Sequence, residues 1–525
     1  MLKSRLCIAF FAFAVGCAPA QKPLTDYVNP MLGTATLWDS VDLGFKPTKR
    51  TWGTEVFPGS SLPNAMVQVS PVTKFHSGAG YQYEDSVIYG FTHTNKGHWN
   101  LCHIPLLPVT GTPTPGDYCS PFSHERESAA PGYYQVFLDR YGVDAQLSST
   151  LRCAFHKYTY PAGAAPAVLA DLQRSNEHVR AWDIRKEGDN VFAGWQQTGE
   201  KMYFYAVANR PVTGIEPVVE GDREVRIVRF GEGDGALELR IGFSFVSEKN
   251  ARENLEAEML GKSFAEVRSE ATATWNDLLG RIRVEGGTER EKGLFYSSLY
   301  RSFLWPALRS DVNGEFTDVD GKVINPGFRY YTGPSYWDDY RNKLILLAPP
   351  TPDVAADVIS YDVDKGEKRG GFMPTFFHGD HASAFVAGTY LRGNRGFDVN
   401  RAYNLVLRNA TVQGPSRPWL DEYIAKGYIS EMDVENPVTW TVCKAAVTKT
   451  LEYSYDDYAV ALLADALGDK ENRDMLMKRT SNYKNLFDPS TGLMRGRLEN
   501  SEWITPFDDQ YPYYEYTVSY THLRA

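Results

Sequence analysis

The stretch Leu237-Glu238-Leu239-Arg240-Ile241-Gly242-Phe243-Ser244-Phe245, with the residues that follow it, decides the fold of this chain. Apolar residues occupy every second position in it, which is the period of a strand with one buried face. Between Leu255 and Leu279 the apolar residues recur every three to four positions instead, the spacing of an amphipathic helix. The change of period predicts a β-structured half that ends near Val246 and a helical half after it.

The β-structured half shows the same alternation in several earlier segments. Tyr203 to Ala208 is one of them, and a longer run comprises Ala145, Leu147, Ser149, Leu151, Cys153 and Phe155. Turn-rich segments such as Gly231-Glu232-Gly233-Asp234-Gly235 separate the alternating runs. Short strands between such turns are typical of antiparallel sandwiches. We therefore expect an antiparallel β-sandwich over residues 21–247.

The helical half divides into a linker and a larger domain. Residues 248–292 predict a helical linker. Further helical patterns occupy Leu294 to Leu308, Ala382 to Leu391, Asn400 to Asn409, Thr448 to Leu467 and Asn472 to Tyr483. Helices that recur at intervals of roughly 40–60 residues, joined by long loops, favour an (α/α) toroid whose loops converge on a central funnel. We expect an incomplete (α/α)6 toroid over residues 293–516.

Composition narrows the class of protein. A chain of 525 residues is too long for one compact core and predicts two or three domains. Its formal net charge of −10, without any basic run, argues against nucleic-acid binding. The 32 tyrosines and 11 tryptophans suit a protein that binds carbohydrate, because aromatic faces stack on sugar rings.

The N-terminus predicts export. Lys3 and Arg5 precede an apolar run from Leu6 to Val15, which is too short to span a bilayer, so residues 1–20 read as a signal peptide. Cleavage after Ala18-Pro19-Ala20 would release a soluble protein, whereas a lipobox ending at Cys17 would leave a lipid anchor in the membrane. Both alternatives place the protein in the periplasm or on the outer-membrane surface of a bacterium.

The remaining cysteines are Cys102, Cys119, Cys153 and Cys443, and no two form a Cys-x-x-Cys pair. That spacing argues against a zinc site. In an oxidising compartment a Cys102–Cys119 disulfide is one alternative, and isolated buried thiols are the other.

The hexapeptide Tyr336-Trp337-Asp338-Asp339-Tyr340-Arg341 concentrates three aromatic rings, two carboxylates and a guanidinium at a loop–helix junction. Aromatic faces with hydrogen-bonding carboxylates suit a sugar ring. The alternative is an exposed helix start, with an aspartate as cap and Arg341 as its ion-pair partner.

Motifs in a constant order along the chain resemble glycoside hydrolase family 92. In the first half they are Val28-Asn29-Pro30, Phe57-Pro58-Gly59, Pro63 to Pro71, Gly80 to Tyr83 and Gly90 to Thr94. In the second half they are Trp337-Asp338 with Arg341, Gly379-Asp380-His381-Ala382, Lys449 to Tyr453, and Asn482 to Pro489.

The resemblance implies a calcium-dependent exo-α-mannosidase that inverts the anomeric centre and acts on mannose-containing glycans. It implies that Trp337, Asp338 and Arg341 bind the sugar, at the concave end of the toroid that faces the sandwich. His98 lies where this sequence departs from the family's Gly-rich pattern. In the family that region shapes the entrance to the sugar site, so His98 is a further candidate for substrate binding.

The resemblance also implies a C-terminally truncated chain. The match fades after Tyr516, before the family's calcium ligands and base motif, and residues 517–525 look like an artefactual tail. Glu515 is the carboxylate nearest to the expected general acid, although an exposed loop carboxylate is the alternative reading. Since inverting hydrolysis needs two carboxyl groups, we expect this chain to hydrolyse α-mannosides far more slowly than a full-length relative.

Two further acidic groupings have structural alternatives. Asp380-His381 offers too few ligands for a metal, so we expect Asp380 to cap a helix and His381 to lie in the funnel wall, where both are candidates for substrate binding. Glu452 and Asp456 are four residues apart and share one helix face. That face is either solvated or part of the funnel.

Two other functions remain open. One is a surface glycan-binding protein without catalysis. The other is a different sandwich-plus-toroid carbohydrate enzyme such as a disaccharide phosphorylase, which would need a phosphate-binding loop, and no convincing one occurs in the sequence.

Overall fold

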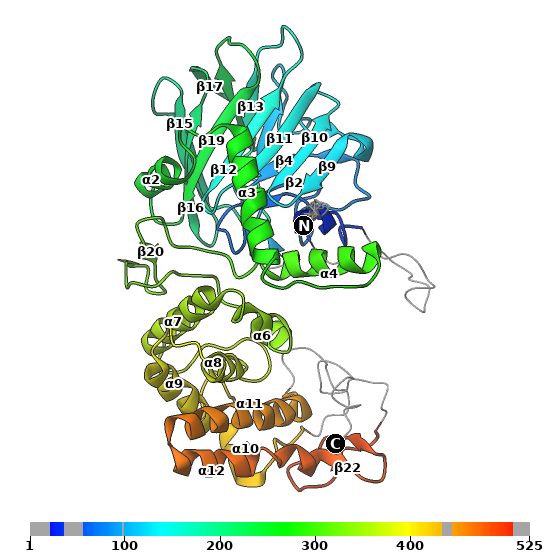
Figure 1. The fold of residues 1–525 in the computed structure, drawn as a ribbon, viewed down its shortest axis with the longest axis vertical. Helices are drawn as coiled ribbons and strands as arrows, with labels where there is room; N and C mark the ends of the chain where they lie inside the picture. Colours follow the sequence, from blue (N-terminus) through cyan, green and yellow to red (C-terminus); the bar gives the residue numbers. More distant parts are fainter. Residues whose placement is uncertain (1–21, 36–55, 97–98, 433–443, 508–525) are drawn as a thin grey trace, which may run out of the picture.

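The computed structural model describes residues 22–35, 56–96, 99–432 and 444–507. A β-sandwich comes first, linker helices follow, and a helical domain forms the opposite end of the molecule (Figure 1). The predicted order of sandwich, helical linker and helical domain is therefore confirmed. Closure of the helices into a toroid stays a prediction. In the described ranges, no helix combines the length and the apolar character needed to cross a membrane.

Two antiparallel sheets make the sandwich. The seven-stranded sheet has, in spatial order, β1 (Ser60–Ser61), β2 (Gln68–Val72), β4 (Gly90–Thr92), β7 (Leu106–Val109), β13 (Ala167–Ala170), β18 (Arg223–Phe230) and β17 (Val212–Glu220). The eight-stranded sheet has β14 (Ala181–Lys186), β15 (Val191–Gln197), β16 (Lys201–Ala208), β19 (Leu237–Ser244), β12 (Cys153–Thr159), β11 (Val143–Ser149), β10 (Tyr133–Leu138) and β9 (Glu127–Ala130).

Strand β19 is the alternating stretch that decides the fold, and it lies inside its sheet between β16 and β12. Its residues Leu237, Leu239, Ile241 and Phe243 are all 0% exposed. Alternate positions point into the space between the sheets, so the period-two pattern marks a buried face.

The run from Ala145 to Phe155, read as one strand, is a hairpin. β11 ends at Ser149 and β12 begins at Cys153, with Ser149 paired to Ala154. Ala145 and Leu147 belong to the sandwich core, whereas Cys153 and Phe155 pack with the linker helices on the outer face. Both faces of this hairpin are buried, so the alternation continues through the turn and hides it from a sequence reading.

Three linker helices connect the domains: α2 (Glu248–Glu258), α3 (Phe264–Leu279) and α4 (Glu289–Ser302). The indole Nε1 of Trp275 on α3 donates to the Ser61 carbonyl oxygen at 2.7 Å and ties the linker to the sandwich. Helix α4 begins before the predicted Leu294, because Thr288 and Glu291 form a capping box at its start. The expected boundary at 292/293 falls within this helix.

Replacing Ser263 with alanine is expected to lower the free energy of unfolding by about 1 kcal/mol. The Ser263 hydroxyl accepts from the Glu266 backbone N–H, and the Glu266 carboxylate accepts from the Ser263 N–H, so the substitution removes half of the capping box of α3. Urea unfolding monitored by circular dichroism measures the change. Ser269→Ala, an exposed position in the middle of the same helix, is the matched control and should be neutral or slightly stabilising.

The helical domain contains α5 (Tyr336–Asp339), α6 (Lys343–Leu347), α7 (Pro352–Lys368), α8 (Ala382–Leu391), α9 (Val399–Thr411), α10 (Leu420–Lys426), α11 (Ala446–Leu467) and α12 (Lys470–Arg479). Helices α8, α9, α11 and α12 match predicted helical patterns. Helix α11 packs against α8, α9 and α12. Helix α7 was missed in the sequence analysis, although Pro352 at its first turn is a common helix-start signal.

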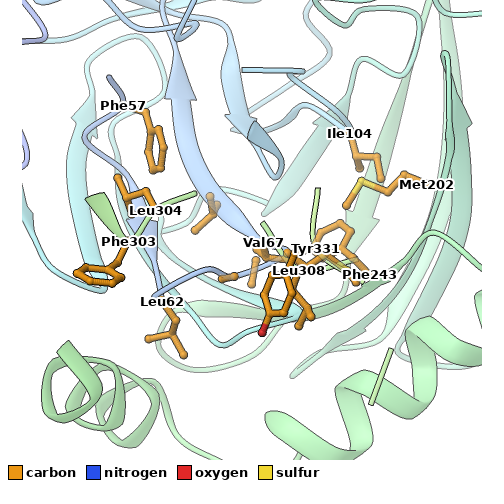
Figure 2. Close-up of a cluster of buried hydrophobic side chains, with 14 of the residues drawn as sticks. Phe57, Leu62, Val67, Ile104, Met202, Phe243, Phe303, Leu304, Leu308 and Tyr331 are labelled. Carbon is orange, nitrogen blue, oxygen red and sulfur yellow. The ribbon is translucent and has the colours of Figure 1, made fainter. Parts of the chain in front are cut away.

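The segment after α4 joins the helical domain to the sandwich. Figure 2 shows Leu308 and Tyr331 from this segment lying against Val67 of the sandwich. Backbone carbonyls complete the contact: the side-chain amide of Gln68 donates to the Leu304 oxygen at 2.7 Å, and that of Asn64 donates to the Pro306 oxygen at 2.9 Å. This junction forms one wall of the cavity described next.

Candidate functional site

A cavity of about 790 Å³ lies between the sandwich and the helical domain. Phe57 and Glu200 line it from the sandwich, Trp305 and Tyr330 from the connecting segment, and Asp338 and Asp362 from the helical domain. Both domains contribute to it, and domain interfaces are frequent locations of ligand sites. Its volume fits one or a few sugar units.

Aromatic rings cover part of the cavity wall. The rings of Tyr330 and Tyr361 stack with centroids 3.8 Å apart and an interplanar angle of 20°. Phe376 lines the same cavity and is 49% exposed, so its ring is accessible from the cavity. An exposed ring such as that of Phe376 beside carboxylates forms the kind of surface that binds the C–H faces and hydroxyl edges of a sugar.

Asp338 lies in the cavity wall on the single-turn helix α5 and is exposed. Its backbone N–H donates to the Ser335 carbonyl oxygen at 2.9 Å, which starts the turn. Within the described part of the chain, its carboxylate has no hydrogen-bond or ion-pair partner. Both carboxylate oxygens are therefore available to a ligand.

Trp337 and Arg341 do not line this cavity. The indole of Trp337 packs edge-on against Phe377, with ring centroids 5.1 Å apart. The Arg341 guanidinium forms an ion pair with Glu452 at 3.4 Å and borders a second, smaller cavity. The hexapeptide motif predicts that Trp337 and Arg341 lie with Asp338, but α5 ends at Asp339. Arg341 therefore lies outside the helix, where the three-residue spacing no longer places it on the face of Asp338.

Asp380 and His381 are buried rather than exposed in a funnel wall, with 0% exposure each. The Asp380 carboxylate accepts from Arg417 Nε at 3.1 Å and from the Asn409 amide at 2.9 Å. It makes no cap to a backbone N–H of α8, whose N-cap position is His381. The prediction of an Asp380 cap is wrong, because the buried guanidinium binds this carboxylate instead.

Glu452 and Asp456 do share one face of α11, and that face is buried against His381. Of the two alternatives, a solvated face is excluded. Neither residue lines the large cavity, so neither carboxylate is placed to contact a ligand there.

Four further predictions from the sequence concern His98, Glu515, the cysteines and calcium. His98 and Glu515, candidates for substrate binding and general acid, lie outside the described residues. Cys102, Cys119 and Cys153 are not joined in any disulfide, so the Cys102–Cys119 disulfide is not formed. Among the described residues, no group of three His, Cys, Asp or Glu side chains is arranged to hold a metal. Calcium dependence therefore stays a prediction.

Asp362 and Lys343 are cavity residues that sequence reasoning missed. Burial raises the pKa of Asp362 to about 6, although a hydrogen bond from the Tyr336 hydroxyl opposes the rise. Burial lowers the pKa of Lys343 to about 8, against the opposing effect of Asp339. A signal was present: Asp362 stands between Tyr361 and Val363 on the buried face of α7, where a carboxylate is unusual. Perturbed groups of this kind are typical of functional sites.

Replacing Asp362 with asparagine is expected to raise the free energy of unfolding near neutral pH by about 2–3 kcal/mol. The folded pKa of about 6 exceeds the ordinary aspartate pKa of 3.8, so the folded protein binds more protons than the unfolded chain between these values. Ionisation of Asp362 therefore costs stability as the pH rises through this window, and the amide abolishes that cost.

Urea unfolding of both proteins at pH 4, 5, 6 and 7 measures the effect. The stability advantage of Asp362→Asn should be smallest at pH 4 and grow towards pH 7. A constant difference across the range would contradict the assignment.

Comparisons with known proteins agree with the sequence resemblance. The model of the glycosyl hydrolase family 92 N-terminal domain matches residues 27–253, and that of the family 92 catalytic domain matches residues 250–522. A curated relative from Arthroderma benhamiae, described as an uncharacterized secreted glycosidase, is 25% identical over 522 residues, covering 88% of this chain and 62% of the relative. The chain thus spans less than two thirds of that relative.

Solved structures give the same family. A family GH92 alpha-mannosidase from Bacteroides thetaiotaomicron has a TM-score of 0.82 and 27% identity, covering 94% of this chain and 69% of that chain, and it has also been solved with mannoimidazole bound. A family GH92 inverting mannosidase from the same species shares the fold, with a TM-score of 0.81 and 24% identity, covering 93% of this chain and 68% of that chain. Since the two family models together account for residues 27–522, the chain belongs to glycoside hydrolase family 92.

Proposed function

We propose that this protein is an exo-acting α-mannosidase that releases terminal α-linked mannose from glycans with inversion at the anomeric carbon. One observation carries the proposal for this chain: Asp338 presents a carboxylate that has no partner among the described residues, in the wall of an interdomain cavity lined by aromatic rings. The family membership and the mannosidases among its similar structures support it.

Each of these cavity side chains has a proposed role in binding the terminal mannose or in proton transfer. Asp338 accepts hydrogen bonds from two hydroxyls of the terminal mannose, and a carboxylate makes such bonds stronger than a neutral acceptor does. The rings of Phe376 and Tyr330 pack along the apolar C–H face of the sugar, and the buried ring of Tyr361 supports Tyr330 by stacking on it. Asp362, with its pKa of about 6, both donates and accepts a proton near neutral pH and lies in the same cavity.

Inversion needs a general acid that protonates the leaving oxygen and a general base that activates water. Glu515 is our proposal for the acid, and the base is not assigned among the described residues. The expectation that the 525-residue chain acts slowly rests on this pair and stays a prediction. Calcium dependence, export to the periplasm or outer-membrane surface, and a lipid anchor at Cys17 are further proposals. The N-terminal sequence and the secreted relative support export.

The test is an assay of the purified protein with aryl α-mannoside and mannobioses, with calcium and with a chelator. Mannose release selective for the α-anomer supports the proposal, and proton NMR that detects β-mannose first establishes inversion. Binding of mannosides without any release would favour the glycan-binding alternative. Release that requires phosphate and yields mannose 1-phosphate would favour a phosphorylase.

A further inference from the structure

The helix that carries Asp338 is too short to hold its own position. Helix α5 comprises four residues, Tyr336 to Asp339, and isolated helices shorter than about 12 residues are marginal in water. Since the Asp338 carboxylate has no partner among the described residues, its position depends on how the rest of this turn is anchored.

Two buried tyrosines one helical turn apart anchor it. Tyr336 and Tyr340 are 3% and 6% exposed, and the Tyr340 N–H donates to the Tyr336 carbonyl oxygen at 3.0 Å. The Tyr336 hydroxyl donates to the Asp362 carboxylate on α7. The Tyr340 hydroxyl donates to the Glu452 carboxylate on α11 at 3.1 Å. Each end of the turn is therefore attached to a different long helix.

His381 completes the second anchor. Its ring stacks on the ring of Tyr340 with centroids 3.6 Å apart and an interplanar angle of 9°. Its Nδ1 lies 2.9 Å from the Asp456 carboxylate and its Nε2 lies 3.4 Å from the Glu452 carboxylate. Burial opposes protonation of His381, but Asp456, Glu452 and Asp380 outweigh it and raise the pKa of the ring. The imidazolium form faces a carboxylate with each nitrogen.

The packing around this ring leaves no spare room. Gly379 has a φ of +77°, and a Cβ built there would lie 2.6 Å from the His381 Nε2 and 3.0 Å from the Glu452 Cβ. Glu452 itself is buried, with 4% of its side chain exposed, while the Arg341 guanidinium that pairs with it is 57% exposed. One buried carboxylate thus holds both Tyr340 and the residue that follows it.

We propose that Tyr340, Glu452 and His381 are positioning residues that hold Asp338 against the sugar, with Tyr336 and Asp362 as the matching anchor at the other end of the turn. The proposal rests on the proposed function in assigning Asp338 to a mannoside. The anchoring itself is independent of any ligand and is measured separately.

The ligand-free measurement is amide hydrogen exchange of residues 336–341, followed by mass spectrometry, in Tyr340→Phe and in Glu452→Gln. Loss of one hydrogen bond to a carboxylate should speed exchange in this peptide roughly tenfold. Tyr403→Phe is the matched control, because the Tyr403 hydroxyl on α9 donates at 2.8 Å to Asp469, the residue that precedes α12. An unchanged exchange rate in Tyr340→Phe would overturn the proposal. If Glu452→Gln does not fold, the result for Tyr340→Phe alone decides.

The ligand-dependent measurement is the affinity for methyl α-mannoside in a double-mutant cycle with Asp338→Ala. Tyr340→Phe should weaken binding about three- to tenfold in the parent and leave the affinity unchanged in the Asp338→Ala background, because it acts through Asp338. An equal loss in both backgrounds would show that Tyr340 does not act through Asp338 and overturns the proposal. If the parent binds no mannoside, the proposed function fails, whereas the exchange result still decides the anchoring.

Discussion

Replacing Arg417 with methionine is expected to lower the free energy of unfolding by about 3–5 kcal/mol, the usual cost of removing one partner from a buried ion pair. Arg417 is 0% exposed, with its Nε 3.1 Å from an Asp380 oxygen and its Nη1 2.6 Å from an Asp457 oxygen. Methionine has a similar volume but no charge. Urea unfolding followed at the helical circular dichroism signal measures the loss.

After the loss of Arg417, Asp457 and Asp380 differ in the hydrogen-bond and ion-pair partners that remain to them. Asp457 keeps Arg479, whose Nε lies 2.9 Å away. Asp380 keeps the neutral donors Asn409 and Ser383, so it bears most of the cost. The double variant Arg417→Met with Asp380→Asn should therefore recover a large part of the stability, because replacing both partners is cheaper than removing one. Arg401→Met, which breaks an exposed pair with Glu367, is the matched control and should cost less than about 1 kcal/mol.

The loss of stability in Arg417→Met should be larger at high pH than at low pH. Burial raises the pKa of Asp380 to about 6, and Arg417 opposes that rise, so removing Arg417 raises it further. A carboxyl group with a raised folded pKa loses stability as the pH rises from its unfolded value to its folded value. Arg417→Met should therefore be less destabilised at pH 5 than at pH 8. An equal deficit at both values would show that Asp380 is not the group left unpaired.

The fold was predictable because each domain has a different hydrophobic period. The alternation of Leu237 to Phe245 and the three-to-four spacing after Leu255 are local signals, and they locate the change from sheet to helix. The hairpin at Ser149 to Cys153 was not predictable, because both of its faces are buried. Periodicity reports how often a face is buried, and it does not report which partner buries it.

The site was only partly predictable. A motif placed Asp338 correctly at a loop–helix junction, but short motifs do not specify where a helix ends. Helix α5 stops before Arg341, and that end decides which side chains face the cavity. Asp362, Lys343 and Glu200 reach the cavity from three distant segments. Their meeting depends on how the domains pack, which no local pattern encodes.

Replacing Asp338 with alanine is expected to weaken the binding of methyl α-mannoside roughly 100-fold or more. Two hydrogen bonds from sugar hydroxyls to a carboxylate are each worth about 1.5–3 kcal/mol, and tenfold in affinity corresponds to about 1.4 kcal/mol. Isothermal titration calorimetry measures the affinity directly, so the result does not depend on turnover. Folding should be preserved, because the Asp338 side chain is exposed and, among the described residues, has no partner to lose.

The comparison between Asp338→Ala and Asp338→Asn separates charge from contact. The amide keeps one acceptor oxygen, so Asp338→Asn should retain part of the affinity that alanine loses. Asp222→Ala, in the exposed turn between β17 and β18, is the control and should bind as the parent does. If Asp338→Ala binds the mannoside as tightly as the parent, the sugar lies elsewhere. The second cavity beside Arg341 would then be the next place to test, since the Arg341 guanidinium is an exposed hydrogen-bond donor at its edge.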